Sequence, residues 1–222
     1  MSSKSAPTAL GPALVIGGCG FVGFHNVDAL LKDPTCGPVS VINDPTVEPG
    51  DHLKISVEGT KNVLICATES PTVKELVYTS TCAVSKGYQH FNIDETTPLW
   101  EENSKTIAYF KAKVLADTLI HEANSLLDRQ GRCLPTATLR LALVYEERDN
   151  QFITGMLKTA GEGQTKIQLA ANEGLAKPTH VGKIATAHLL AAKKLLESES
   201  GSLDPKVDGE AFHITDGDPQ PL

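Results

Sequence analysis

A cysteine framework, an excess of basic residues and a long apolar run are all missing from this 222-residue chain. Its five cysteines form no CxxC pair, so neither a disulfide framework nor a zinc site is expected, and a reducing compartment is the simplest interpretation. The 27 acidic and 20 basic residues give a formal net charge of -7, which argues against a nucleic-acid partner. No apolar run approaches the roughly 18 residues of a membrane-spanning helix. We therefore expect a chain that is soluble, or at most peripheral to a membrane.

The chain has enough apolar material for one packed domain, because 41% of its residues are hydrophobic and 21% are charged. Short β-branched runs alternate with segments of helical periodicity, which predicts an α/β fold with a Rossmann-like, doubly wound parallel sheet. The expected strands are 13–16, 38–42, 76–79, 136–145 and 211–214, and the expected helices are 24–32, 54–69, 107–127, 152–160 and 181–196. Residues 8–145 are interpreted as a dinucleotide-binding part and 146–222 as a partial substrate-binding part of effectively one domain.

A glycine-rich turn, GGCGFVG, connects the first expected strand to the first expected helix. Gly17 permits a tight turn, Gly20 lets backbone approach a pyrophosphate, and Gly23 lets the helix pack closely. The phosphates are expected at the helix N-terminus, beside Phe21 and Val22. A plain strand-to-helix turn stays an alternative, but the context favours dinucleotide binding.

The end of the second expected strand carries the residue that would bind a ribose of the dinucleotide. In dinucleotide-binding folds this residue is acidic and lies about 20 residues beyond the glycine motif, a position that falls at Asn43 or Asp44 here. Asp44 favours NAD, because no arginine stands beside it to bind the 2′-phosphate of NADP, although NADP stays open. The alternative is that Asp44 only begins an Asp-Pro turn.

A YxxxK motif lies on the longest expected helix, with Tyr109 and Lys113 on one helix face. An ammonium group near the phenol would lower the phenol pKa and make Tyr109 a better general base. An exposed helix face without chemistry is the alternative for an isolated YxxxK. Together with the upstream glycine motif, the pair predicts a catalytic tyrosine and its electrostatic partner.

Hydroxyl side chains end the third expected strand, in Thr79-Ser80-Thr81. The carboxyl edge of a parallel sheet is where ligands bind in such folds, so Thr81 is positioned to hydrogen-bond the reacting oxygen together with Tyr109. A structural role is the common one for threonine at a strand end and stays an alternative.

The motifs GGCGFVG, VYTST and YFKAK, in this order, resemble the extended short-chain dehydrogenases/reductases. Four further segments, VEGTKNVL, RLALVYEERDNQFITGML, HVGKIATAHLLAA and GEAFHITDGDPQP, resemble the 3β-hydroxysteroid dehydrogenase branch of that family. Within this branch the chain is most similar to the decarboxylating sterol-4α-carboxylate 3-dehydrogenases. The resemblance extends over nearly all of the chain from about Ala13 onward.

The resemblance implies a catalytic triad of Thr81, Tyr109 and Lys113, with the glycine motif as the phosphate-binding loop. The implied reaction transfers the C3 hydride of a 3β-hydroxy sterol or triterpenoid to NAD or NADP. A substrate with a C4 carboxyl group would become a β-keto acid, which loses carbon dioxide through an enolate. The implied location is the cytosolic face of the endoplasmic reticulum, by peripheral membrane association or through partner enzymes, and otherwise the cytoplasm. A homodimer stays open.

The chain also departs from the family, being shorter internally and at its C-terminal end. Only nine residues, Pro45–Leu53, stand where the family has its third strand, a helix and its fourth strand, and Ser56 stands where it has asparagine. With central strands missing, residues 13–16 and 76–79 either pair directly or leave the core open, and the C-terminal part is the remnant of a substrate domain. The alternatives are a catalytically impaired fold that binds only a nucleotide or a protein, and an extended short-chain dehydrogenase for another small-molecule alcohol.

Overall fold

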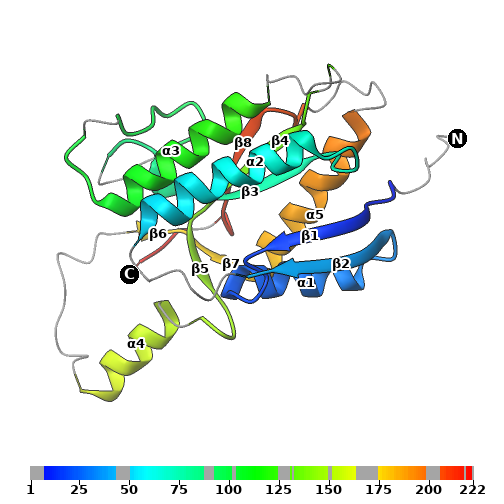
Figure 1. The fold of residues 1–222 in the computed structure, drawn as a ribbon. Coiled ribbons are helices and arrows are strands. Elements are labelled where there is room, and N and C mark those ends of the chain that lie inside the picture. The colour runs from blue at the N-terminus through cyan, green and yellow to red at the C-terminus, as the bar shows by residue number, and fades with distance from the viewer. Residues whose placement is uncertain are drawn as a thin grey trace, which may run out of the picture.

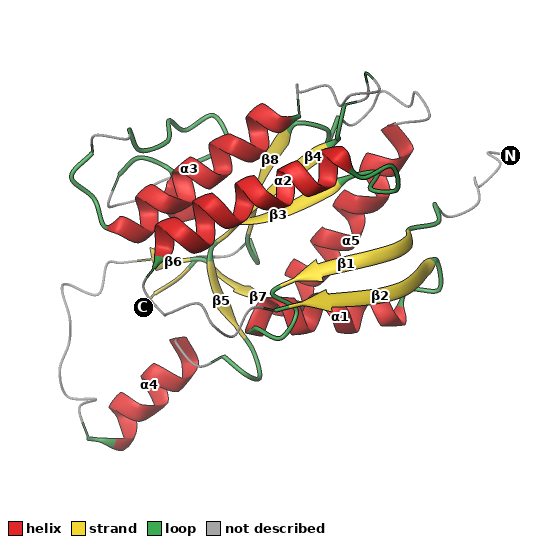
Figure 2. Cartoon of the chain, viewed as in Figure 1, coloured by secondary structure: helices red, strands yellow, loops and turns green. Residues whose placement is uncertain are grey.

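Strands and helices alternate along the chain in the computed structural model (Figures 1 and 2). The structure describes residues 8–43, 51–87, 93–101, 104–124, 131, 133–149, 152–163, 175–198, 206–217 and 219–221. The strands are β1 (Gly11–Ile16), β2 (Cys36–Ile42), β3 (Leu76–Thr81), β4 (Thr136–Leu141), β5 (Leu143–Tyr145), β6 (Leu175–Ala176), β7 (Pro178–His180), β8 (Glu210–Ile214) and β9 (Gln220–Pro221). The helices are α1 (Phe21–Lys32), α2 (Gly59–Glu69), α3 (Ala108–Ala123), α4 (Phe152–Gly161) and α5 (Val181–Ser198), with a π-helical turn η1 (Lys54–Glu58) and a 3-10 turn η2 (Cys82–Val84).

The expected parallel sheet is divided into two parts. One part has three parallel strands in the order β3-β4-β8, and the other pairs β1 with β2 in parallel. Within the described residues, no strand pairing joins β1 to β3. The α/β fold with parallel strands is therefore confirmed, and of the two outcomes expected for the missing central strands, the structure shows the open core.

The three-stranded sheet is covered by a helix on each face. Neighbouring side chains of a strand point to opposite faces, so the partners of adjacent β3 residues show which helix covers which face. Ser80 of β3 bonds Asp117 of α3, whereas Thr79 bonds His188 of α5. Leu139 of β4 and Ile184 of α5 belong to the buried apolar core on the α5 side. Helices α3 and α5 thus lie on opposite faces of this sheet, with α2 packed beside α3 (Figure 1).

Helix α5 also connects the two sheets, since it packs against α1 as well as against β3 and β4. Val22 of α1 contacts the core around β4 and α5. At the other end of this helix pair, Lys193 Nζ lies 2.5 Å from an Asp33 carboxylate oxygen. The residue ranges 8–145 and 146–222 therefore share one layered core.

The β1–β2 pair is covered by α1 on one face and has an exposed apolar face on the other. Leu14, Ile16 and Ile42 are 55%, 54% and 53% exposed to solvent. Ile16 and Ile42 are register partners and so lie on the same face. Parallel sheets in α/β proteins usually have both faces covered. The exposure of this face follows from the separation of the two sheets.

Two expected elements differ in the structure. Helix α1 begins at Phe21, within the glycine motif, instead of at residue 24. The strand expected over 136–145 is two strands, β4 and β5, because they pair with different partners: β4 with β3 and β8, and β5 with β7. None of the described helices has the length and apolar character needed to cross a membrane.

Candidate active site

The glycine motif forms the turn between β1 and α1. Gly17 has a φ of 80°, and its N–H donates to the Ile42 carbonyl oxygen at 2.7 Å. A Cβ on Gly23 would collide with the Gly17 carbonyl oxygen, and one on Gly18 would lie 2.7 Å from a Val41 methyl group. The positive φ of Gly17 and the close packing of Gly23 agree with the prediction. Gly23, however, packs against the backbone of the loop rather than against the sheet.

The N-terminus of α1 is suited to an anionic group. Its N-cap residue Gly20 has no side chain to accept a hydrogen bond, and the first turn contains no acidic residue. The first N–H groups of a helix lack partners within the helix and favour negative charge. The residues present therefore fit the pyrophosphate of a dinucleotide. The ribose-binding prediction at Asp44 falls outside the described residues.

Tyr109 lies in the first turn of α3. Its ring packs edge-on against His52, with 5.3 Å between ring centroids, and against Phe110 at 5.9 Å. Burial raises the pKa of Tyr109, which corrects the prediction that Lys113 lowers it. His52 was not predicted, because a single histidine in a short loop carries no spacing signal.

Lys113 lies one turn after Tyr109, but its ammonium group contacts β3. Nζ donates to the Thr79 carbonyl oxygen at 3.4 Å and lies 5.3 Å from the centroid of the Tyr78 ring. Burial lowers the pKa of Lys113, whereas the Asp117 carboxylate raises it. The motif thus brings the ammonium to the sheet rather than to the Tyr109 phenol.

Thr81 is the last residue of β3 and caps the turn η2. Its hydroxyl oxygen accepts a hydrogen bond from the Ala83 N–H at 3.2 Å. Because the oxygen acts as acceptor in this bond, the hydroxyl proton remains free for donation. Thr81 and the Lys113 ammonium therefore lie along the same carboxyl-terminal half of β3.

The structure brings Lys113 close to the strand of Thr81, but it leaves the glycine motif apart from both. No hydrogen bond, ion pair or ring contact in the described part of the chain joins that motif to Tyr109, Lys113 or Thr81. A cavity of about 390 Å³ lies elsewhere, along another side of α3. Its lining residues are Leu53, Trp100, Glu101, Lys111, Val114, Leu115 and Thr118. None of the predicted catalytic residues lines it.

A buried ionic cluster fixes α3 against β3 and β4. Asp117 and Arg140 retain only 2% and 6% exposure, and Arg140 Nη2 donates to Asp117 Oδ1 at 2.8 Å. The other carboxylate oxygen accepts from Arg140 Nε at 3.2 Å and from Ser80 Oγ at 2.6 Å. Both Asp117 oxygens are thus engaged one helical turn beyond Lys113.

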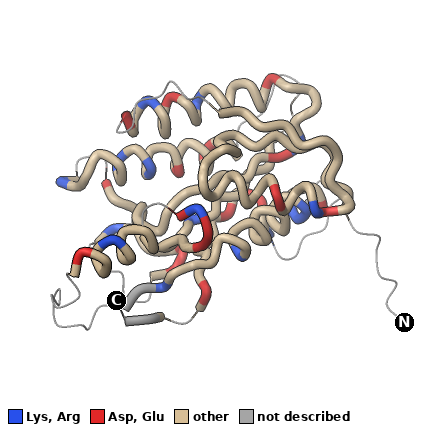
Figure 3. The backbone as a smooth tube through the Cα atoms, turned by 90° about the horizontal axis from the view of Figure 1, so that it is seen from below, with Lys and Arg blue, Asp and Glu red and all other residues tan. Residues whose placement is uncertain are grey.

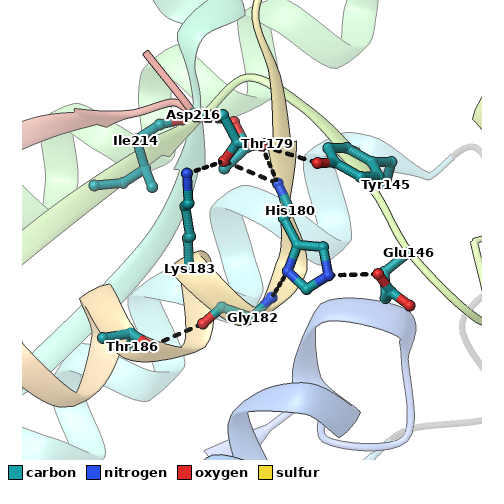
Figure 4. Close-up of polar contacts among 9 residues, drawn as sticks. All are labelled: Tyr145, Glu146, Thr179, His180, Gly182, Lys183, Thr186, Ile214 and Asp216. Carbon is teal, nitrogen blue, oxygen red and sulfur yellow. Dashed lines mark hydrogen bonds and ion pairs between the residues drawn. The ribbon is translucent and has the colours of Figure 1, made fainter. Parts of the chain in front are cut away.

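A second polar cluster surrounds Asp216, at the N-terminus of α5 (Figure 4). The Asp216 carboxylate accepts hydrogen bonds from the Tyr145 hydroxyl at 3.0 Å and from the His180 backbone N–H at 3.2 Å. Lys183 Nζ lies 3.2 Å from it. Together these partners lower the pKa of Asp216 against the raising effect of burial.

The His180 ring belongs to the same cluster. Its Nδ1 accepts from the Gly182 N–H at 3.0 Å, and its Nε2 lies 2.5 Å from a Glu146 carboxylate oxygen (Figure 4). Because Nδ1 is an acceptor, the neutral ring carries its proton on Nε2. These groups hydrogen-bond one another, so we interpret the cluster as a structural connection between β5, β7 and α5.

Acidic and basic positions are interspersed along the described backbone (Figure 3).

Comparison with known proteins finds a family model and individual relatives that this chain resembles. Residues 39–221 match the model of the 3-beta hydroxysteroid dehydrogenase/isomerase family. The chain is 37% identical over 167 residues to the decarboxylating sterol-4-alpha-carboxylate 3-dehydrogenase of Schizosaccharomyces pombe, a match covering 75% of this chain and 45% of that protein. It is 26% identical over 247 residues to the corresponding protein of Bos taurus, covering 94% of this chain and 66% of the relative.

The lengths of these matches bear on the expected shortening. The chain spans less than half of the length of the yeast relative. The bovine alignment covers 247 positions and is therefore longer than the chain of 222 residues, so the relative has internal residues with no counterpart here. This agrees with the expected internal shortening.

Solved structures share the fold at low identity. The dTDP-glucose 4,6-dehydratase from Bacillus anthracis, in complex with NAD, has a TM-score of 0.68 and 19% identity, covering 95% of this chain and 77% of that chain. The UDP-glucose 4-epimerase of Thermus thermophilus, also with NAD, has a TM-score of 0.64 and 19% identity, covering 95% and 79%.

Proposed function

Because the chain belongs to the 3-beta hydroxysteroid dehydrogenase/isomerase family, we propose that it is an NAD-dependent oxidoreductase acting on the 3β-hydroxyl of a sterol with a 4α-carboxyl group. The observation that carries the proposal is the placement of the YxxxK lysine, whose ammonium reaches the Thr79 carbonyl oxygen on β3, the strand that ends at Thr81. The glycine-rich start of α1 supplies the anion-binding turn that a dinucleotide needs. The relatives' names supply the substrate class.

In the proposed reaction, NAD supplies the hydride acceptor, and the residues of this chain control the proton. Tyr109 accepts the proton of the C3 hydroxyl, and Thr81 donates a hydrogen bond to the same oxygen. Since burial raises the pKa of Tyr109, its phenolate needs a nearby cation. Lys113, one turn later on the same helix face, supplies this cation from its place at the Thr79 carbonyl.

Loss of the carboxyl group follows from the product of this oxidation. The C3 ketone stands β to the C4 carboxylate, so carbon dioxide leaves with the bonding electrons passing to an enolate, which is then protonated. Donors that bind the C3 oxygen stabilise this enolate. Thr81 therefore serves both steps at one oxygen atom. From the resemblance to sterol-processing relatives, we propose that the reaction takes place at the cytosolic face of the endoplasmic reticulum.

The test has a binding part and a turnover part. The purified chain is melted with NAD and with NADP, because a ligand that binds only the folded state raises the midpoint. Turnover of a 4α-carboxysterol is then followed by NADH absorbance and by release of carbon dioxide. Tyr109→Phe should abolish turnover and keep the NAD-induced shift, whereas Tyr145→Phe, the same change in the Asp216 cluster, should keep both. Turnover by the Tyr109→Phe variant would refute the assignment.

A fold that binds the nucleotide without turnover is the second candidate function. The observation that favours it is the absence of pairing between β1 and β3 among the described residues, since the nucleotide turn follows β1 and the catalytic residues lie on β3 and α3. An NAD-induced rise of the midpoint without any NADH from the sterol substrate would support this second function.

A further inference from the structure

Lys113 is half-buried, and its ammonium group has few protein partners among the described residues. Burial lowers its pKa, as expected for a cation in a poorly solvated place. In the described part of the chain, Nζ makes one hydrogen bond, the 3.4 Å contact to the Thr79 carbonyl oxygen. An ammonium has three donors, so this single long bond leaves two of them without a protein partner among the described residues.

The nearest carboxylate does not supply a direct partner. Asp117 stands one turn after Lys113 and raises its pKa, but both of its oxygens are engaged by Arg140 and Ser80. The charge of Asp117 is also offset by the Arg140 guanidinium, 2.8 Å away. A group that faces the ammonium from the sheet therefore adds to its stabilisation.

The Tyr78 ring is that group. Its centroid lies 5.3 Å from Lys113 Nζ, within the range of a cation–π contact. The phenol end of Tyr78 lies near the side chain of Thr60 on α2, which lowers the pKa of Tyr78 less than burial raises it. Burial raises the pKa of Tyr78 far above its usual range, so this phenol stays neutral and does not act as a second base.

We propose that Tyr78 is a positioning residue whose ring face seats the Lys113 ammonium at the carboxyl-terminal half of β3, ready for the cofactor and Tyr109. The inference deepens the proposed function and rests on it for the catalytic consequence. The position of the Lys113 ammonium on the Tyr78 ring, called the seat below, depends only on contacts of Tyr78, Lys113, Thr79 and Thr60.

The seat is tested on Lys113 itself, by NMR of protein labelled with 13C at lysine Cε, with Lys113→Arg used to assign the signal. Tyr78→Leu removes the ring and should lower the Lys113 pKa, because the ammonium loses its stabilising face. Tyr78→Phe keeps the ring and should leave that pKa unchanged. Val77→Ala, on the opposite face of β3, is the matched packing control and should also leave it unchanged.

The catalytic consequence is measured by NAD titration of the same variants. Tyr78→Leu should weaken NAD binding by about tenfold, the size of a desolvated cation–π contact of about 1.4 kcal/mol, and Tyr78→Phe should restore it. A lowered Lys113 pKa in a chain that never binds NAD would support the seat and refute the proposed function. NAD binding with an unchanged Lys113 pKa in Tyr78→Leu would do the reverse.

A measurement on the unaltered chain covers the case in which Tyr78→Leu does not fold. Protons on Lys113 Cε should show nuclear Overhauser contacts to the Tyr78 ring protons, and these contacts should persist in Tyr78→Phe to the ring at the same position. Their absence in the folded, unaltered protein would overturn the proposal.

Discussion

Breaking the buried pair between Asp117 and Arg140 should be among the most destabilising single changes in this chain. Asp117→Asn keeps the size of the side chain but leaves the Arg140 guanidinium, with 6% exposure, without a counter-charge. Arg140 Nη1 already has no hydrogen-bond partner within the described residues, so no spare acceptor is at hand. Removing one partner of a buried pair costs about 3–5 kcal/mol, and we expect a loss of this size in the free energy of unfolding.

Urea unfolding followed by circular dichroism measures this loss, with the slope checked for an unchanged transition. The control is Lys61→Met, which removes the exposed pair with Glu58 and should cost less than about 0.5 kcal/mol. Replacing Asp117 and Arg140 together by leucine should recover much of the loss, since no buried charge then lacks a partner. A cost below about 1 kcal/mol for Asp117→Asn would refute the view that this pair anchors α3.

Three further changes test other parts of the structure. Gly23→Ala should abolish the NAD-induced rise in melting temperature, because the new Cβ collides with the loop backbone. Gly155→Ala is the control and should keep that rise, because the space around Gly155 is open. An unchanged rise in both variants would contradict the assignment of the loop to NAD binding. Hydrogen bonds from Lys193 and Thr35 lower the pKa of Asp33 to about 2, so its contribution to stability is present above the ordinary pKa of 3.8 and is lost as pH falls toward 2. Urea unfolding between those pH values should show a smaller loss in Lys193→Met, and an equal loss would count against the pair. Leu14→Lys should leave stability nearly unchanged and reduce self-association in sedimentation velocity, because it places a charge on an exposed apolar face; equal self-association would show that this face is not involved.

The local parts of the fold could be predicted from the sequence because their signals are local. An apolar run followed by glycines marks β1 and its turn, and the positive φ of Gly17 follows from the same pattern. The start of α1 was predicted three residues late, because the helix begins within the glycine motif itself. The break between β4 and β5 could not be predicted, since it arises where neighbouring residues pair with different strands.

The candidate site shows the same division between local and tertiary information. Helical spacing places Tyr109 and Lys113 on one face of α3, but the direction of the lysine depends on Tyr78 and Thr79 of a strand distant in sequence. The predicted lowering of the Tyr109 pKa was wrong for this reason, since burial dominates when the ammonium lies elsewhere. The Ser80 and Asp117 contact also needs β3 and α3 to be packed together before it can be recognised.

The separation of the two sheets changes how cofactor binding and folding depend on each other. The glycine turn belongs to the β1–β2 sheet, whereas Thr81 and Lys113 lie on β3 and α3, and α5 is the helix that packs against both halves. In the proposed function a dinucleotide contacts both halves, so part of its binding free energy is spent on holding them in one arrangement. Binding is then weaker than in a continuous sheet, and the bound state gains a connection that β1 and β3 do not make by themselves. Under the proposed function, cofactor affinity and the stability of the β1–β2 unit are therefore linked, and we expect a change that loosens the Asp33–Lys193 contact to lower both.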